Sequence, residues 1–288
     1  MPAPQVICFG EVLWDLLPSG KIAGGAPMNV AFHLNQLGVP AGMVSRVGSD
    51  ELGSELLGFL QDKQIPTGLI QTDGTYPTGT VKVTLDAGGH PSYEIVRPSA
   101  WDYIDCETTA ENAVQHADML VFGSLVCRHE KSRETLEKLI GLANYKVFDV
   151  NLRQPFFSEN LIRELLLKAD LVKMNDDELA IITGWLNIGG DDAQRMASLL
   201  LRFDLQGIIV TRGAQGAAFH DGDHYYEMPG IRVTVQDTIG SGDAFLAGFL
   251  SRKLKNAAPE TCLEFAGKMG AFVATQKGGT PEHSGDFE

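Results

Sequence analysis

The chain has 288 residues, with 23 lysines or arginines against 37 aspartates or glutamates, so its formal net charge is −14. This acidic balance argues against a nucleic-acid partner, because phosphate neutralisation needs a basic surface, and against an anionic membrane as partner. The 32 glycines are about 11% of the residues, against roughly 7% on average. Without a repeat or low-complexity tract, these glycines are expected at defined turns and close backbone approaches.

The N-terminal residues and the cysteines predict a cytoplasmic protein. The first ten residues carry no basic segment, and the apolar run at 6–9 is too short for a signal peptide. No stretch reaches the about 18 apolar residues that a transmembrane helix needs. The cysteines are scattered without a Cys-x-x-Cys pair, which is typical of reduced structural thiols: Cys8, Cys106, Cys127 and Cys262.

Short apolar runs alternate with helical patterns along most of the chain. Most runs are continuously apolar, which is typical of strands buried on both faces of a parallel sheet. We expect strands at 5–9, 42–47, 119–122, 146–150, 171–175 and 207–211. We expect helices at 27–37, 51–63, 108–116, 130–143, 159–169, 177–183, 192–203 and 244–254. This alternation predicts an α/β fold with a doubly wound, mainly parallel sheet flanked by helices.

The region 76–98 interrupts this alternation. Two strand-like runs at 78–85 and 92–96 are joined by Asp86-Ala87-Gly88-Gly89-His90-Pro91, which is a hairpin signal. The run at 12–17 could add another short strand. We therefore expect one domain over residues 1–288 with an inserted lid at approximately 12–22 and 76–98. A small open sheet leaves an apolar face and edges uncovered, and a second subunit could cover them, giving a homodimer through the lid.

A second hairpin is expected near residue 220, with strands at 216–219 and 224–228. The segment His220-Asp221-Gly222-Asp223-His224 between them resembles a metal cluster. Because Asp-Gly is turn chemistry, we interpret this segment as a hairpin turn.

The strongest local signal is Asp237-Thr238-Ile239-Gly240-Ser241-Gly242-Asp243-Ala244-Phe245, directly before a helical pattern. Glycines before a helix let several backbone N–H groups point at one place, and with the helix dipole they form an anion site without lysine or arginine. Asp243 would repel that anion unless it faces a second reactant, as a general base beside a transferring phosphoryl group does. The alternative is an acid at a helix N-terminus with no other role.

Two further glycine segments are candidate ligand loops. In Ala23-Gly24-Gly25-Ala26-Pro27-Met28-Asn29-Val30-Ala31, two glycines precede a proline at a helix start, so Asn29 lies in the first turn. In Val210-Thr211-Arg212-Gly213-Ala214-Gln215-Gly216-Ala217, glycines follow a buried strand, where open α/β sheets bind ligands. Ordinary turns would explain either segment equally simply.

Together these segments resemble the ribokinase-like (PfkB) family of carbohydrate kinases, over nearly the whole chain. The segments 24–31 and 237–245 are similar to the two signatures of that family, and they stand in the same order. Trp14-Asp15-Leu16-Leu17-Pro18, Arg97-Pro98-Ser99-Ala100-Trp101-Asp102 and Phe148-Asp149-Val150-Asn151-Leu152-Arg153 resemble the fructokinase branch.

The resemblance implies roles for the matching residues. Asp243 would be the catalytic base, and the backbone N–H groups of Gly240, Ser241 and Gly242 would hold the charge that develops on the γ-phosphate. The residues that would contact the sugar or line the site beside it are Asp15, Gly25, Asn29, Asn151 and Arg153. Arg97 would meet a sugar or the carboxylate of an acid sugar, or it is a surface residue after the lid strand.

The resemblance also implies the cofactors. Thr211, Gly213 and Gly216 would contact ATP. Asn175 and Glu178 match a motif tied to Mg²⁺ and phosphate, with Glu178 reaching Mg²⁺ through water; the same pair also fits a helix capping box. Some members bind K⁺ through backbone carbonyls, and Asp237 and Ile239, with the loop from Val273 to Gly279, occupy the corresponding region.

The sequence therefore predicts an ATP- and Mg²⁺-dependent sugar kinase that converts D-fructose to fructose 6-phosphate. One alternative is a kinase of the same family for 2-keto-3-deoxygluconate, ribose or a nucleoside. Another is a sugar- or nucleotide-binding protein without turnover, although such a protein has no physical need for Asp243.

Overall fold

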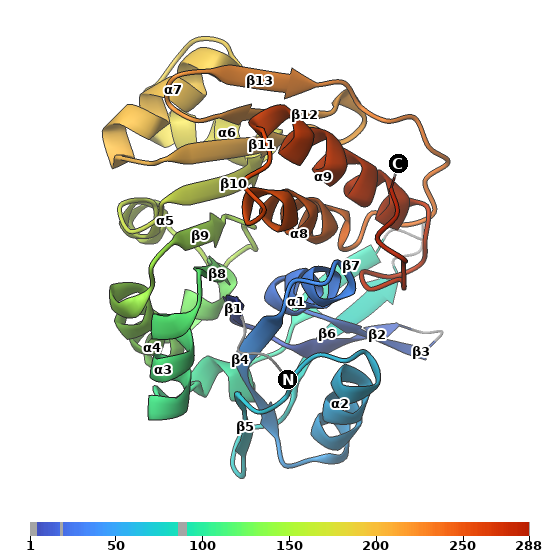
Figure 1. Ribbon diagram of the computed structural model, residues 1–288. Coiled ribbons are helices and arrows are strands. Elements are labelled where there is room, and N and C mark those ends of the chain that lie inside the picture. The colour runs from blue at the N-terminus through green and yellow to red at the C-terminus, as the bar shows by residue number, and fades with distance from the viewer. Residues whose placement is uncertain (1–4, 18–19, 86–90, 288) are drawn as a thin grey trace.

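The computed structural model describes residues 5–17, 20–85 and 91–287, and these form two sheets with surrounding helices (Figure 1). The large sheet has nine strands in the order β13-β12-β11-β10-β9-β8-β1-β4-β5. Its pairs are parallel except β11–β12 and β12–β13, which are antiparallel. The strands are β1 (Val6–Phe9), β4 (Ala41–Gly48), β5 (Ile70–Asp73), β8 (Met119–Gly123), β9 (Lys146–Asp149), β10 (Leu171–Asn175), β11 (Gly207–Thr211), β12 (Ala217–His220) and β13 (Tyr225–Met228).

Helices cover both faces of this sheet (Figure 1). On one face lie α3 (Thr108–His116), α4 (Glu130–Leu142), α5 (Glu159–Leu166), α6 (Asp176–Trp185) and α7 (Asp192–Phe203). On the other lie α1 (Ala26–Gln36), α2 (Glu51–Asp62), α8 (Ser241–Lys253) and α9 (Pro259–Ala274). Short 3-10 helices occur at Ala100–Tyr103, Leu125–Arg128 and Gly213–Gln215.

Alternate residues of the strands fill two separate cores. Ile7 and Phe9 of β1 pack into the core beneath α3–α7, whereas Val6 and Cys8 pack into the core beneath α1, α2, α8 and α9. All four side chains have no exposed surface. Both cores need apolar residues from the same strand, which explains why these strands read as continuous apolar runs.

The small sheet contains β2 (Leu13–Leu17), β3 (Gly20–Gly24), β6 (Gly79–Leu85) and β7 (Pro91–Ile95) in the order β3-β2-β6-β7. The β2–β6 pair is parallel, and the two outer pairs are antiparallel. This sheet confirms the expected hairpin and its added strand, although most of the connecting turn, residues 86–90, lies outside the described residues. Trp14 faces away from the cleft described below, and its Nε1 donates to the carbonyl of Leu52 on α2 at 3.0 Å.

The expected elements are present, with shifted ends and some omissions. The second hairpin is also present, as β12 and β13. Helix α8 begins at Ser241 instead of 244, and α5 ends at Leu166 instead of 169. Sequence reasoning did not predict β3, β5 or α9. Helix α9 is buried on most sides, against α8 and the β12–β13 hairpin, and its exposed polar face is narrow, with Glu260, Glu264 and Lys268 spaced four residues apart. Val273 and Ala274 therefore belong to a helix, which corrects the loop expected from Val273 to Gly279.

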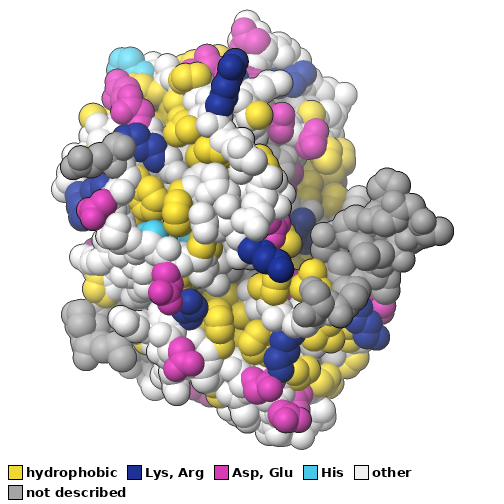
Figure 2. Space-filling view, turned by 90° about the vertical axis from the view of Figure 1, so that its right-hand side faces the viewer, with side chains coloured by type: hydrophobic (Ala, Val, Ile, Leu, Met, Phe, Trp, Pro, Cys, Tyr) yellow, Lys and Arg dark blue, Asp and Glu magenta, His cyan; other side chains and the backbone are white. Residues whose placement is uncertain are grey.

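The surface seen in Figure 2 intersperses acidic and basic side chains among polar and apolar ones. In the described ranges, no helix has the length and apolar content to cross a membrane.

Candidate active site

A deep cleft of about 1110 Å³ opens where the parallel strands end. Its walls are the residues after β1, β9, β10 and β11, one face of the small sheet, and the first turns of α1 and α8. The strand order reverses at β1, which lies between β8 and β4, and α/β sheets bind ligands beside such a reversal. The residues expected in a site that do line the cleft are Asp15, Gly25, Asn29, Asn151, Arg153, Asn175, Glu178, Thr211, Gly213, Gly216, Ile239, Gly240, Ser241, Gly242 and Asp243.

The N-terminus of α8 presents backbone donors to this cleft. Gly240 caps the helix in the left-handed conformation, with φ of 75°. Among the described hydrogen bonds, the N–H groups of Gly240, Gly242 and Asp243 have no acceptor, while that of Ser241 donates to the Thr238 carbonyl at 3.3 Å. The geometry therefore leaves two of the three expected donors free and the third weakly engaged.

Close backbone contacts explain why glycine is needed at this turn. A Cβ on Gly240 would lie 2.4 Å from Cα of Gly279, and a Cβ on Gly279 would lie 2.9 Å from Nδ2 of Asn29. The segment before the helix is fastened to the same place, because Oδ2 of Asp237 accepts from the N–H of Gly278 at 3.2 Å. Asp237 therefore lies next to Gly278, although it is not among the residues that line the cleft.

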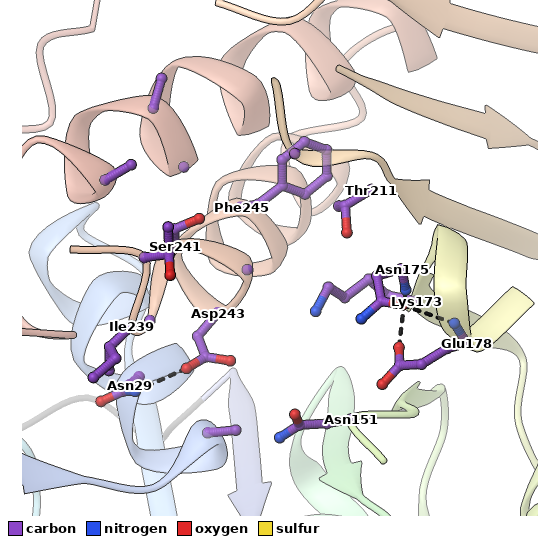
Figure 3. Close-up of a pocket in the computed structure, with 18 of the residues that line it drawn as sticks. Asn29, Asn151, Lys173, Asn175, Glu178, Thr211, Ile239, Ser241, Asp243 and Phe245 are labelled. Carbon is purple, nitrogen blue, oxygen red and sulfur yellow. Dashed lines mark hydrogen bonds between the residues drawn. The ribbon is translucent and has the colours of Figure 1, made fainter. Parts of the chain in front are cut away.

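Asp243 is buried in the first turn of α8. Nδ2 of Asn29, from α1, donates to Oδ2 of Asp243 at 2.8 Å, as Figure 3 shows. Oδ1 has no hydrogen-bond partner among the residues described, so one oxygen is fixed and the other faces the cleft. Burial, and then the negative charge of Asp149, raise the pKa of Asp243 from 3.8 to about 6, opposed by the positive charge of Lys173.

The opposite wall is the capping box of α6. The side-chain Oδ1 of Asn175 accepts from the N–H of Glu178 at 2.8 Å, and Oε2 of Glu178 accepts from the N–H of Asn175 at 2.9 Å. Oε1 of Glu178 accepts from the N–H of Leu152 at 2.8 Å, and burial raises the pKa of this carboxyl group. The capping role is therefore confirmed, and both oxygens keep a second lone pair for water or a cation. In the described chain, no three His, Cys, Asp or Glu residues are grouped to ligate a metal directly.

Lys173, which the sequence reasoning missed, stands between these two walls. Its Nζ donates to the two carboxylate oxygens of Asp149 at 3.0 and 3.1 Å, and both side chains are buried. Nζ also lies 3.1 Å from the place that a Cβ of Gly242 would occupy, so glycine at this position leaves room for the ammonium group. Its signal was a charged residue within an otherwise apolar strand, which a buried strand tolerates only when the charge is paired.

Glu11, also missed, follows the central strand β1. It is 3% exposed and lines the cleft beside the first turn of α1. Its signal was an acid directly after a buried strand, at the edge of the sheet where ligands bind.

The other expected residues lie on the rim or outside the cleft. Asn151, with φ of 39°, adopts the left-handed conformation directly after β9, and asparagine tolerates this better than most residues do. Arg153 lines the cleft and is exposed. Arg97 does not line it: the side chain is exposed, with its guanidinium carbon 5.7 Å from the Phe156 ring centroid. The strand β7 ends two residues earlier, so Arg97 lies beyond the sheet that forms the wall.

Glycines shape the part of the cleft beside β11 as well. Gly216 has φ of 97°, and a Cβ there would lie 2.0 Å from the carbonyl oxygen of Met228. Thr211 and Gly213 line the same part, and the connection from β13 to α8 closes it with Ile231 and Val233. Backbone contacts therefore shape this end of the cleft, and Ile231 and Val233 add apolar side chains to its lining.

Comparisons with known proteins agree with this geometry. The sequence model of the pfkB family of carbohydrate kinases matches residues 19–284. The chain is 31% identical to a fructokinase of Klebsiella pneumoniae, over 95% of this chain and 94% of that protein. It is 30% identical to fructokinase-1 of Zea mays, over 96% of this chain and 93% of that protein.

Solved structures show the same likeness. A fructokinase double mutant from Vibrio cholerae O395, bound to fructose, ADP and potassium ion, is similar with a TM-score of 0.83 and 25% identity, over 97% of this chain and 95% of that one. A fructokinase from Xylella fastidiosa with bound ATP is similar with a TM-score of 0.82 and 26% identity, over 96% and 93% of the two chains.

The buried pair of Lys173 and Asp149 yields a stability prediction. Lys173→Met should lower the free energy of unfolding by about 3–5 kcal/mol, because it leaves the Asp149 carboxylate buried and unpaired. The double variant Lys173→Met/Asp149→Asn should regain part of this loss, since neither charge remains. Urea unfolding measures both values. A single variant that is as stable as the wild type would show that the pair is not buried as described.

Proposed function

The chain belongs to the pfkB family of carbohydrate kinases, and we propose that it is an ATP- and Mg²⁺-dependent sugar kinase that converts D-fructose to fructose 6-phosphate. One observation carries this proposal. Asp243 is buried with a free carboxylate oxygen, next to backbone N–H groups that have no acceptor at the start of the same helix. A base for a hydroxyl and donors for a transferring phosphoryl group are the two parts that phosphoryl transfer requires.

Asp243 acts on the acceptor hydroxyl of the sugar. Oδ1 takes the proton as the hydroxyl oxygen attacks the γ-phosphorus, and the bond from that phosphorus to the bridging oxygen breaks, so that ADP leaves. Asn29 holds Oδ2 and so fixes the orientation of the carboxylate. The free N–H groups of Gly240 and Gly242, with that of Ser241, then stabilise the charge on the phosphoryl oxygens. The ammonium group of Lys173 lies beside Gly242 and adds positive charge at the same place.

Two sets of residues would hold the cations. Asn175 and Glu178 would hold Mg²⁺ through its waters, which suits a cation that keeps most of its hydration shell and two side chains already fixed by backbone N–H groups. When bound, Mg²⁺ would neutralise charge on the phosphate oxygens. The backbone carbonyls of Asp237 and Ile239 would hold K⁺. Thr211, Gly213 and Gly216 contact the nucleotide.

Fructose is favoured over an acid sugar by the charges of the cleft. Glu11, Asp15 and Asp243 line the end next to the small sheet. Arg153 acts electrostatically on all three acids, and Lys173 acts on Asp243. Arg97, the residue expected to meet a sugar carboxylate, lies outside the lining. The names of the relatives, which include fructokinases at 31% and 30% identity, support the same substrate.

The remaining parts of the proposal concern the whole molecule. The small sheet, at approximately 12–22 and 76–98 of one domain, serves as a lid that closes over the sugar and excludes water. A second copy covers the outer part of this lid in a homodimer. All four cysteines are free thiols, which supports a cytoplasmic enzyme.

A substrate panel tests the function. ADP release is measured with ATP and Mg²⁺ for D-fructose, 2-keto-3-deoxygluconate, ribose and a nucleoside. We expect the highest kcat/KM with fructose. A higher kcat/KM for another compound would make that compound the substrate, and the protein would still be a kinase. Sugar binding without ADP release would favour a binding protein.

Replacing the base tests the chemistry. Asp243→Asn keeps the size of the side chain but cannot accept the proton, so kcat should fall by about 10²–10⁴-fold. Calorimetry should show fructose binding within a few-fold of the wild type, because the contacts of the neighbouring side chains remain. Asp176→Asn, an exposed acid at the rim of the cleft, is the matched control. Turnover at the wild-type rate in Asp243→Asn would refute the assignment of the base.

The pH profile follows from the raised pKa of Asp243, about 6 in place of 3.8. The base must be ionised, so kcat/KM should be constant above this pKa and fall about tenfold for each pH unit below it. Initial rates between pH 5 and 8 measure the profile. An activity that stays constant down to pH 5 would mean that Asp243 titrates near its ordinary value or is not the base.

A further inference from the structure

Two buried acceptor atoms beside Asp243 have no hydrogen-bond donor among the described residues. One is Oε2 of Glu11, and the other is Oδ1 of Asn29. Both residues line the cleft and are 3% exposed. A buried polar atom without a partner costs about 1–3 kcal/mol, so its persistence needs an explanation.

The contacts of Glu11 leave this oxygen to a ligand. Its other oxygen, Oε1, accepts from the N–H of Ala26 at 3.2 Å, which attaches the carboxylate to the first turn of α1. The backbone here is tightly packed, because a Cβ on Gly25 would lie 2.3 Å from the carbonyl oxygen of Glu11. The carboxylate is therefore held in place by its surroundings, while Oε2 stays unpaired.

The charged groups around Glu11 are mostly negative. Two charged side chains act on Glu11 electrostatically: the acid Asp243 on α8 and the cation Arg153 after β9. Asp15 on β2 lines the same end of the cleft. Burial raises the pKa of Glu11 to about 7. Two acids and one exposed cation therefore surround Glu11, and with Glu11 itself these acids disfavour an anionic ligand and favour one that brings hydroxyl donors.

We propose that Glu11 is a specificity-determining residue, whose Oε2 accepts a hydrogen bond from a hydroxyl of the sugar that is not phosphorylated. Asn29, which the resemblance already assigns to the sugar, has its unpaired Oδ1 in the same part of the cleft. The inference rests on the proposed function and extends it, because it assigns the discrimination between a neutral polyol and an acid sugar to one side chain. A carboxylate of the ligand at this place would meet Glu11 and Asp243 at once.

A double-mutant cycle between the protein and the sugar tests this assignment. The specificity constant kcat/KM is measured for the wild type and for Glu11→Gln, with D-fructose and with its 1-, 3- and 4-deoxy analogues. The wild type should lose about 10–100-fold on the one analogue that lacks the donor hydroxyl. With fructose, kcat/KM of Glu11→Gln should be lower than that of the wild type by a similar factor. With the analogue that lacks the donor hydroxyl, kcat/KM of Glu11→Gln should fall little further. With the other two analogues, the loss from the variant and the loss from the missing hydroxyl should multiply. KM for ATP should stay within twofold.

The controls separate a failure of this inference from a failure of the proposed function. Glu134→Gln changes an exposed acid on α4 and should behave as the wild type throughout. If the loss of kcat/KM from Glu11→Gln multiplies with the loss from the missing hydroxyl for all three analogues, Glu11 contacts none of these hydroxyls. Glu11 then only supports the fold, and the inference is overturned. If another sugar is the substrate, the cycle is run with the deoxy analogues of that sugar. A wild type that phosphorylates no sugar at all overturns the proposed function, and this inference with it.

Discussion

The burial of several carboxylates around one cleft is the constraint on which this structure depends. Glu11, Asp149, Glu178 and Asp243 are each at most 9% exposed. A buried anion is tolerated when hydrogen bonds or an opposite charge replace its water. The contacts differ among these carboxylates: Asp149 is paired with Lys173, Glu178 accepts from two backbone N–H groups, Asp243 accepts from one side-chain amide, and Glu11 accepts from one backbone N–H group. These contacts link β9 to β10, the segment after β9 to α6, and α1 to α8.

The strength of each compensation matches the role of the residue. Each carboxylate oxygen of Glu178 accepts from a backbone N–H group, so the orientation of this side chain is fixed. A fixed carboxylate suits the support of a cation. Asp243 and Glu11 each have one oxygen bound and one oxygen without a partner in the described structure. Burial then raises the pKa of both groups, so they are weaker acids and better proton or hydrogen-bond acceptors than exposed carboxylates. In the proposed reaction, these two unpaired oxygens accept the proton and the hydrogen bond of the sugar.

Sequence reasoning found the parts of the site that have a local signature. Gly240, Gly242 and Asp243 could be recognised because glycine before a helix has a physical purpose at a single turn. Lys173 and Glu11 have no such signature, since their meaning depends on Asp149 and Ala26, which are 24 and 15 residues away. The sequence neighbours of Arg97 also resemble a site, but its guanidinium carbon lies 5.7 Å from the Phe156 ring centroid, outside the lining of the cleft. Periodicity predicted most strands of the large sheet but missed β5 and also α9, whose exposed polar face is narrow.

The acidic composition and the abundant glycine now have a common explanation. In the proposed reaction, one end of the cleft offers acceptors to the sugar. The other end offers donors to the phosphate, from the backbone at Gly240 and Gly242 and from the buried Lys173. Backbone donors carry no net charge, so the protein can remain at −14 and still bind phosphate. A side chain must not cover these donors. Gly240 and Gly279 meet this condition because they lie too close together for a Cβ on Gly240. A basic patch would attract phosphate without orienting it, whereas rigid backbone donors do both beside the carboxylate that must remain free.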